Sequence, residues 1–405
     1  MKNYKPLGKY IQPVAGRNND LGDLPLMGLS IQKKFIPSIA NTIGTDMSTY
    51  RIIEKNQFAY GPVTSRNGDK ITIALFNDFD KALISQAYIP FEVKDTKELD
   101  PEYLMMWFRR PEFDSYARFK SHGSAREIFD WEEMCNTLLP VPHIDKQREI
   151  VVEYNTIQNR IKLNEQLIQK LEETAQAIYK QWFMEFEFPD ENGNPYKSNG
   201  GEMVWNEELG KEIPKRWEVK PLREIVSVID NRGKTPICVD NKTIYPLIEI
   251  GAIRNESRVI DYTKCEKYID ESTYKNWFRS GHPIKKDILF STVGSLAEMK
   301  VFWNKNGSIA QNIVAFRCND DIGLYLYQML INCKNDLVSY EIGSVQASIK
   351  VSQVIDFRIT IPNHGIIRKF EEISSVLTNH VNIISQENQK LSELKALLLS
   401  RLATV

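Results

Sequence analysis

The sequence is poor in the features that mark several common protein classes. Its 405 residues include five cysteines, and no two of them form a Cys-x-x-Cys pair. An odd, scattered set argues against a disulfide framework or a zinc site and favours a reducing compartment, so we expect a cytoplasmic protein that holds no metal. No run of about 18 apolar residues occurs, and the first residues lack an apolar signal segment, so we expect neither a membrane span nor secretion.

An excess of charge of one sign is also missing. The 52 Lys and Arg residues balance 53 Asp and Glu residues, which leaves a formal net charge of −1. Free-standing nucleic-acid-binding domains are usually basic. A chain of this composition that binds nucleic acid would therefore rely on a local basic face or on partners.

The common catalytic motifs are absent or incomplete. The stretch 231–235, Asn-Arg-Gly-Lys-Thr, suggests a phosphate-binding loop, but Val228 stands where that motif needs its first glycine and Pro236 follows it. Asn194-Pro195-Tyr196 resembles part of the tetrapeptide of amino-methyltransferases but lacks its second proline. No nucleophile elbow, zincin motif or nuclease-like acidic cluster is present. The sequence therefore favours recognition over catalysis, with no cofactor bound by this chain.

The clearest positive feature is an internal repeat. Each half contains a strand-like run with a central glutamine, Gln86 or Gln311, followed by a Tyr-Leu pair, a polar Gly-Ser loop and a short apolar run that closes on proline. From the Gly-Ser pair onward the copies are 220 residues apart, as in Gly123 and Gly343 or Pro142 and Pro362. Such a pseudo-twofold chain presents two similar surfaces at a fixed separation.

Two long helices are predicted, one after each copy. Apolar residues recur with alternating spacings of three and four from Ile150 to Trp182, interrupted by Asn164, and a second stripe begins at Phe370. The polar interruption of the second stripe, Glu387-Asn388, is expected at a different height from Asn164. The stripes most simply bury each other in an antiparallel pair; two separate amphipathic helices, or a homodimer through the stripes, remain alternatives.

The predicted fold class is α+β, with two mixed α/β domains separated by a pair of long antiparallel coiled-coil helices. We divide the chain into a first domain (1–143), a central long helix (144–188), a linker dense in turn formers (189–216), a second domain (217–363) and a C-terminal long helix (364–405).

Polar loops at matching places in the two copies are the candidate recognition surfaces. Arg side chains pair with guanine edges, Asn and Gln with adenine, and Lys and Ser with phosphate. The loop from Tyr116 to Arg126 contains no acid. The candidate DNA-binding residues are Thr64, Ser65, Arg66, Asn67, Lys70, Gln86, Arg118, Lys120, Ser121, His122, Ser124, Arg126, Arg232, Lys234, Ser291, Thr292, Ser295, Lys300, Gln311, Ser344, Gln346 and Lys350.

An aromatic run at the end of the first long helix is the candidate docking surface for a partner protein. Tyr179, Trp182, Phe183 and Phe186 exceed what a two-helix seam buries, and exposed aromatic side chains concentrate at interfaces. The alternative is a local core at the end of the helix pair.

Several segments resemble the specificity (S) subunit of type I restriction–modification systems, over nearly the whole chain. Residues 165–183 are similar to the central helix of that family, and residues 187–196 and 213–217 to the linker and the start of its second target-recognition domain. Residues 139–150 match its strand-to-helix join, whereas the second copy departs from the pattern with Ile367 in place of glutamine.

The resemblance implies a non-catalytic DNA specificity subunit. Each target-recognition domain would read one half of a bipartite, asymmetric site on double-stranded DNA, and the helices would set the unread spacer. Two methyltransferase (M) subunits would dock on the chain and restriction (R) subunits would join them; S-adenosylmethionine, ATP and magnesium belong to those partners. The alternative is a non-enzymatic two-headed coiled-coil scaffold without a DNA role.

Overall fold

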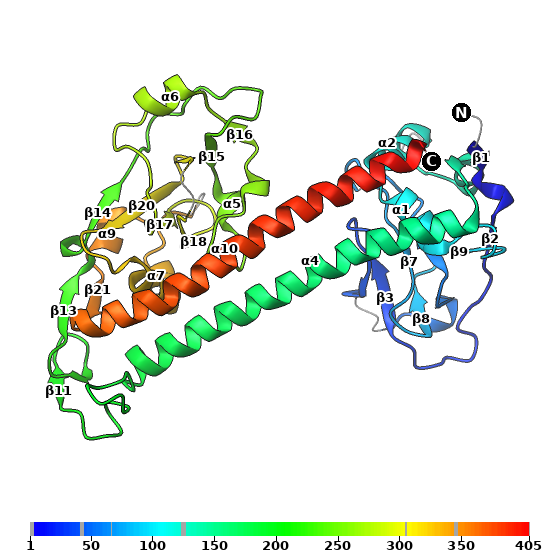
Figure 1. Cartoon of the computed structure of the whole chain (residues 1–405). Coiled ribbons are helices and arrows are strands. Elements are labelled where there is room, and N and C mark those ends of the chain that lie inside the picture. Colours follow the sequence, from blue (N-terminus) through cyan, green and yellow to red (C-terminus); the bar gives the residue numbers. More distant parts are fainter. Residues whose placement is uncertain are drawn as a thin grey trace. The chain divides into compact units, whose positions relative to one another are not determined.

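The chain divides into two units, each with its own core. In the computed structural model, which describes residues 4–40, 44–65, 67–122, 127–303, 306–343 and 347–404, unit 1 comprises Met1–Ile161 with Leu391–Val405, and unit 2 comprises Lys162–Lys390. Both contain strands and helices, and two long helices are present, which confirms the predicted α+β class (Figure 1). No described helix is both long enough and apolar enough to cross a membrane.

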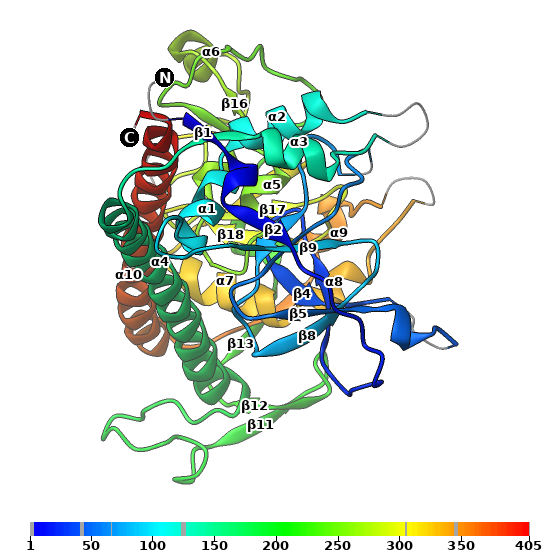
Figure 2. The ribbon, with the colours of Figure 1, turned by 90° about the vertical axis from the view of Figure 1, so that its right-hand side faces the viewer.

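Unit 1 contains two four-stranded sheets and a two-stranded ladder. The first sheet has the order β2-β9-β6-β7, the second β4-β3-β8-β5, and the ladder joins β1 to β10. Every pairing is antiparallel except that of β3 with β8. Figure 2 looks onto this unit, with β2 and β9 side by side. The strands are β1 (Tyr4–Pro6), β2 (Ile11–Pro13), β3 (Leu26–Leu29), β4 (Phe35–Pro37), β5 (Arg51–Glu54), β6 (Phe58–Tyr60), β7 (Ile73–Leu75), β8 (Lys81–Ile84), β9 (Ile89–Val93) and β10 (Leu138–Pro140).

Unit 2 repeats most of this topology, although its smaller sheet has three described strands and no counterpart of β5. Its larger sheet has the order β14-β20-β17-β18, its smaller sheet β16-β15-β19 again contains one parallel pair, and β13 pairs with β21 as β1 pairs with β10. The hairpin β11-β12 precedes the copy. The strands are β11 (Met203–Asn206), β12 (Lys211–Pro214), β13 (Glu218–Pro221), β14 (Val226–Ile229), β15 (Pro246–Ile248), β16 (Lys267–Tyr268), β17 (Ile288–Ser291), β18 (Met299–Val301), β19 (Ser308–Ile309), β20 (Ile313–Cys318) and β21 (Arg358–Ile361).

The helices follow the same duplication. In the first copy they are α1 (Pro101–Phe108), α2 (Pro111–Lys120), α3 (Trp131–Asn136) and α4 (Ile144–Tyr179). In the second they are α5 (Ile250–Ile253), α6 (Glu271–Asn276), α7 (Gly323–Asn332), α8 (Lys334–Val338), α9 (Val351–Ile355) and α10 (His364–Arg401). The long helices α4 and α10 begin 220 residues apart, as the repeat predicts.

Local capping explains where several helices begin. The Asp100 carboxylate accepts hydrogen bonds from the backbone N–H groups of Glu102 and Tyr103, and Pro101 occupies the first position of α1. The Asn363 side chain accepts from the Ile366 N–H at the start of α10. Such caps satisfy donors that a helix leaves unpaired.

The prediction that Gln86 and Gln311 each lie at the centre of a strand is wrong. The strand β8 ends at Ile84 and β9 begins at Ile89, in a different sheet, so Gln86 lies in the turn between them. Gln311 lies in the corresponding turn between β19 and β20. The side chain of Ser85 accepts the Ala87 N–H, and this local bond competes with continued strand pairing.

The long helices pack in antiparallel fashion within unit 2. The Asn164 Nδ2 of α4 donates to Glu387 Oε2 at 3.1 Å and to Asn388 Oδ1 at 2.8 Å on α10. The polar interruptions of the two stripes therefore meet at one height, contrary to expectation, and satisfy one another. The helix α4 ends at Tyr179 and is followed by a single π-helical turn, Lys180–Met184, so the regular helix is shorter than residues 144–188.

Candidate nucleic-acid interface

The two units build equivalent loop clusters at the places the repeat predicts. In unit 1, Ile128 bridges to Val63 on one side and His122 on the other. In unit 2, Ser348 bridges to Val293 and Ile342. Because His122 and Ile342, and likewise Ile128 and Ser348, are 220 residues apart, both clusters present the same backbone framework. We call their described residues recognition cluster 1 (63–65, 67–70, 116–122, 127 and 128) and recognition cluster 2 (291–295, 342, 343 and 347–350).

A short hydrogen-bond chain fixes the base of recognition cluster 1. Thr64 Oγ1 donates to Ser121 Oγ at 2.8 Å, and Ser121 Oγ donates to the Ala117 carbonyl at 2.7 Å. Thr64 is only 2 % exposed, so its assignment to DNA binding is wrong: the hydroxyl is used to close the loop. Ser121 remains half-buried beside it.

Three cations of this cluster, Arg118, Lys120 and His122, each face an acid that follows the 116–126 loop in the sequence. Arg118 pairs with Glu127, Lys120 with Glu133 at 3.4 Å, and His122 Nε2 lies 3.8 Å from Glu133. The loop segment contains no acid, but folding brings two to it. The half-exposed Arg118 guanidinium reaches DNA only if the phosphates or base edges replace Glu127, so the cluster is neutralised before binding.

The remaining candidates of the first copy are spread over the surface. Ser65 and Lys70 are exposed, and half-buried Asn67 donates through Nδ2 to the Val63 carbonyl at 3.1 Å. Gln86 is exposed, in its turn between two sheets. Arg66, Ser124 and Arg126 lie outside the described residues.

Three candidates of the second copy are buried, and their assignment to DNA binding is wrong. Ser291 and Thr292 are 0 % exposed, and their hydroxyls donate to the carbonyls of Ser295 and Asn312. Lys300 is 4 % exposed and its Nζ donates to the Asn255 carbonyl at 2.6 Å. Ser291 ends strand β17, Thr292 follows it and Lys300 lies on β18, so all three polar side chains are part of the interior of the fold.

Burial disfavours the charged form of Lys300. Desolvation lowers the pKa of its amine to about 8, against the attraction of Glu172 and Glu298. A lysine whose charged form is disfavoured in this way contributes poorly to phosphate binding.

A second basic surface of unit 2 is built by the loop after β14. Arg232 donates to both carboxylate oxygens of Asp230, at 2.9 Å and 2.7 Å, and this pairing lowers the pKa of that carboxyl. Arg279 donates to the Arg232 carbonyl at 2.9 Å. Lys234 Nζ lies 3.8 Å from the centre of the Trp277 ring. This surface contains the predicted Arg232 and Lys234 and adds two residues.

Gln311 joins the same surface, because its side chain hydrogen-bonds Thr235. Arg279 and Trp277 are the residues that sequence reasoning missed, although Trp277-Phe278-Arg279 is a visible aromatic and basic triplet. The remaining candidates of the second copy are half-buried Ser295 and exposed Lys350. Ser344 and Gln346 lie outside the described residues. Among the described side chains, no group of three or more His, Cys, Asp and Glu residues could hold a metal ion.

The aromatic run after α4 belongs to the core of unit 2, so the predicted docking surface is wrong. Tyr179, Phe183 and Phe186 are 4–6 % exposed. Phe183 packs against Trp217 and Tyr325, with ring centroids 5.9 Å and 4.8 Å apart. Trp182 is half-buried against the same core. The globular part of the unit covers the rings that a two-helix seam leaves exposed.

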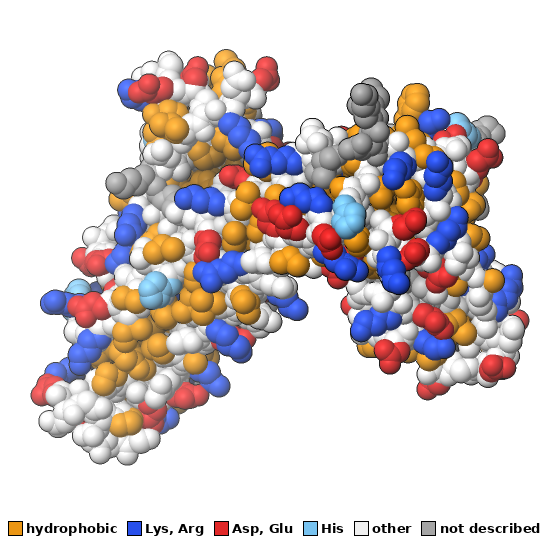
Figure 3. Space-filling view, turned by 45° about the vertical axis from the view of Figure 1, so that its right-hand side comes forward, with side chains coloured by type: hydrophobic (Ala, Val, Ile, Leu, Met, Phe, Trp, Pro, Cys, Tyr) orange, Lys and Arg blue, Asp and Glu red, His pale blue; other side chains and the backbone are white. Residues whose placement is uncertain are grey.

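Other apolar side chains of the long helices are exposed instead. Successive residues of a helix are rotated by about 100°. On α4, Leu163 and Leu167 therefore point about 140–180° away from Glu172, which faces the core. On α10, Val376 and Ile383 point about 140–160° away from buried Thr378. These four are 48–60 % exposed. Figure 3 shows hydrophobic side chains gathered on one face of unit 2. We call these four residues the apolar helix face.

Comparisons with known proteins agree with both halves of the repeat. A family model described as "Type I restriction modification DNA specificity domain" matches residues 15–173 and 214–396. The specificity subunit of the type I restriction enzyme MjaIX from Methanocaldococcus jannaschii is 26 % identical over 321 residues, which covers 74 % of this chain and 68 % of that protein. The HindI specificity subunit from Haemophilus influenzae is 22 % identical, covering 92 % and 91 %.

A solved structure shares the fold. The crystal structure of a type I restriction–modification S subunit from M. genitalium superposes with a TM-score of 0.56 at 14 % sequence identity, over 99 % of this chain and 95 % of that chain.

Proposed function

Because this chain belongs to the type I restriction–modification DNA specificity family, we propose that each of its units reads one half of a split, asymmetric site on double-stranded DNA. One observation carries this proposal. Recognition clusters 1 and 2 share a backbone framework, while their side chains differ. Equal frameworks with different side chains suit two readers of two different sequences, since sequence is read through side chains at base edges.

Charge and exposure distinguish the residues that would read base edges from those that would contact phosphates within each half-site. The Arg118–Glu127 pair and the Arg232–Asp230 pair each hold a guanidinium in place beside an acid. Arginine recognises guanine through two parallel hydrogen bonds. On DNA binding, the base edge would replace the acid as the partner of the guanidinium. This exchange adds selectivity, because a wrong base leaves the guanidinium without a matching acceptor. Exposed Lys70 and Lys350 suit phosphate contacts.

The long helices set the unread gap between the half-sites in this proposal. The 36 residues of α4 give a helix of roughly 54 Å at 1.5 Å per residue. Asn164, bonded to Glu387 and Asn388 between the helices, suits a role in fixing their register, as single polar residues do in coiled coils.

The chain itself is non-catalytic in this proposal, and methyltransferase subunits dock on it. The apolar helix face supports a docking role, since its four exposed apolar side chains on the two long helices would be covered by a partner protein. S-adenosylmethionine would be bound by the methyltransferase subunits, and ATP and magnesium by the restriction subunits. The nearly neutral net charge fits a subunit whose partners supply part of the phosphate contact.

Selection of DNA from a random pool tests the proposal. The chain, purified with the methyltransferase encoded beside it, should enrich duplexes that carry two fixed sequence blocks separated by a gap of constant length. The affinity for those duplexes should fall steeply as salt rises. Enrichment of no motif, with weak binding that is insensitive to salt, would favour the two-headed scaffold without a DNA role.

A further inference from the structure

A strip of buried polar side chains runs along the face of α10 that meets the rest of unit 2. Glu371, Ser374 and Thr378 follow one another at helical spacing and are 0–3 % exposed. Coiled-coil and core-facing positions are usually apolar. Polar residues at three successive contact positions therefore indicate directional contacts between this helix and the domain beside it.

Arg258 is the partner of two of them and also reaches the other long helix. This arginine lies between α5 and β16 and is 0 % exposed. Its Nη1 donates to Thr378 Oγ1 at 3.1 Å and to Ser374 Oγ at 3.3 Å on α10. Its Nε donates to Glu172 Oε2 on α4 at 2.9 Å, and its backbone N–H donates to Glu172 Oε1 at 2.8 Å. One side chain of the domain thus holds both long helices.

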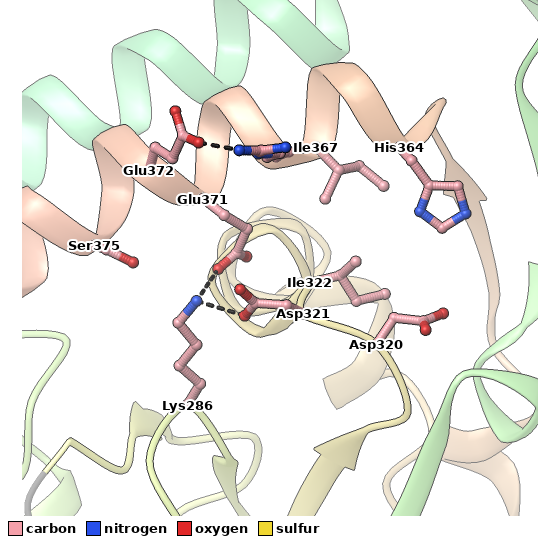
Figure 4. Close-up of a pocket in the computed structure, with 10 residues that line it drawn as sticks. Lys286, Asp320, Asp321, Ile322, His364, Ile367, Glu371, Glu372 and Ser375 are labelled. Carbon is pink, nitrogen blue, oxygen red and sulfur yellow. Dashed lines mark hydrogen bonds and ion pairs between the residues drawn. The ribbon is translucent and has the colours of Figure 1, made fainter.

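Glu371 makes the second attachment. Its Oε1 accepts hydrogen bonds from the backbone N–H groups of Leu324 and Tyr325 at the start of α7, at 2.7 Å and 2.8 Å. Its Oε2 pairs with Lys286 at 2.9 Å, and Lys286 also pairs with Asp321 (Figure 4). Lys286, Asp321 and Glu371 line a pocket of about 500 Å³ beside α10. The carboxylate therefore joins α10 to two segments of the domain.

In unit 1, by contrast, the end of α10 and the turn after it contribute apolar side chains to the core. Leu399 and Leu402 belong to the buried cluster that contains Phe58 and Tyr103. Apolar contacts are non-directional, so they tolerate small slides and rotations. The hydrogen bonds of the polar strip do not, because a slide of α10 by one turn, about 5.4 Å, would take Ser374 and Thr378 away from the buried Arg258 guanidinium and leave the buried Glu371 carboxylate without its partners.

We propose that the polar strip, with Arg258 at its centre, fixes the register and rotation at which the second recognition domain is attached to the helix pair. Arg258 is then a positioning residue for the length of the unread gap, although it touches no DNA. This inference rests on the proposed function, because it assigns the setting of the gap to specific buried contacts. One base pair of extra gap displaces a half-site by about 3.4 Å and rotates it by roughly 35°, so small changes in attachment would alter gap selection.

The test removes the two charges and keeps the volume. Arg258→Met replaces the guanidinium by an apolar chain, and Glu172→Gln retains an acceptor for the Arg258 backbone N–H. Replacing both members of a buried ion pair is often tolerated, whereas removing one leaves an uncompensated charge. The double variant, in complex with the methyltransferase subunit, is incubated with three sets of duplexes. All three have unchanged half-sites, and the gap between the half-sites has the native length, is one base pair shorter or is one base pair longer. Methylation of each is compared.

The double variant should lose about tenfold in discrimination between the native and the altered gaps, while both half-site sequences remain unchanged. That figure lies within the range of roughly 2- to 150-fold that couplings between contacting residues span. Phe302→Leu, in a fully buried position of the same unit, is the control for lost stability and should keep full discrimination. Thr378→Val, which removes one hydroxyl partner of Arg258, should shift discrimination in the same direction by a smaller factor and serves if the double variant does not fold.

Two outcomes overturn the inference, and they are distinguishable. If the folded variants discriminate between gap lengths as well as the wild-type chain does, the polar strip does not set the gap, although the proposed function stands. If the wild-type chain methylates all gap lengths equally, the helices set no gap, and the proposed function fails at that step together with this inference.

Discussion

A substitution of Lys300 tests quantitatively whether this polar residue belongs to the interior of the fold or contacts DNA. The side chain lies on β18, 4 % exposed, with its Nζ 2.6 Å from the Asn255 carbonyl. Lys300→Met keeps the length of the side chain and removes its charge. We expect this variant to bind DNA as the wild-type chain does and to be more stable near pH 7.

The magnitude follows from the lowered pKa. The ordinary pKa of the amine, 10.5, falls to about 8 in the folded protein because of burial. At about 1.36 kcal/mol per pH unit, the charged form destabilises the folded state by about 3 kcal/mol below pH 8. Loss of the hydrogen bond to Asn255 offsets about 1.5–3 kcal/mol of that gain. The net stabilisation near pH 7 is therefore about 1 kcal/mol, or roughly 2–4 °C in melting temperature.

The pH dependence has a definite sign. Between pH 8 and pH 10.5 the unfolded chain binds the proton that folded Lys300 has released, so the contribution of this residue to stability rises with pH. Thermal unfolding of wild type and variant, measured at pH 7 and pH 9.5, should show the advantage of Lys300→Met shrinking or reversing at the higher pH. A variant with unchanged melting temperature and weakened binding to the second half-site would refute the reasoning, because it would place the amine on DNA.

Three further predictions concern the surfaces described above. Arg118→Ala, which breaks an exposed pair with Glu127, should change the free energy of unfolding by less than about 1 kcal/mol. In competition assays it should weaken binding to the first half-site by about 1–3 kcal/mol. An equal loss of affinity for all duplexes would make Arg118 a phosphate contact. Phe183→Ala should cost about 3–5 kcal/mol in a denaturant titration, and an unaffected midpoint would contradict its place in the core. Ile383→Asp should prevent co-purification of the methyltransferase subunit without lowering the melting temperature, whereas Ser392→Asp, which adds the same charge at an exposed position about 180° around α10 from Ile383, should leave the complex intact.

The duplicated architecture is predictable because it is written in local patterns. The matched positions of Gly123 and Gly343 and of Pro142 and Pro362 predict the loops and the strand-to-helix joins of both copies. Among the described residues, His122 and Ile342, which make equivalent bridges, and the starts of α4 and α10 are each 220 residues apart. Helical period likewise predicts both long helices. Patterns of this kind depend on residues close together in sequence, so a single sequence reveals them.

Exposure, by contrast, depends on contacts between distant residues. The aromatic run is too large for a two-helix seam, and Trp217 and Tyr325, from two other segments, complete its core. Arg258 lies in a polar segment that has the composition of a solvated turn, and its partners are 86, 116 and 120 residues away. No local pattern distinguishes such a residue from a surface arginine.

Mapping methylated bases tests the central claim most directly. The chain and its neighbouring methyltransferase are expressed together in a host that lacks other methylation systems, and methylated adenines are located by long-read sequencing. The account predicts one split motif, with two specified blocks and a gap of constant length, that disappears when the chain is omitted. Methylation at a continuous motif, or the same motif without the chain, would contradict it.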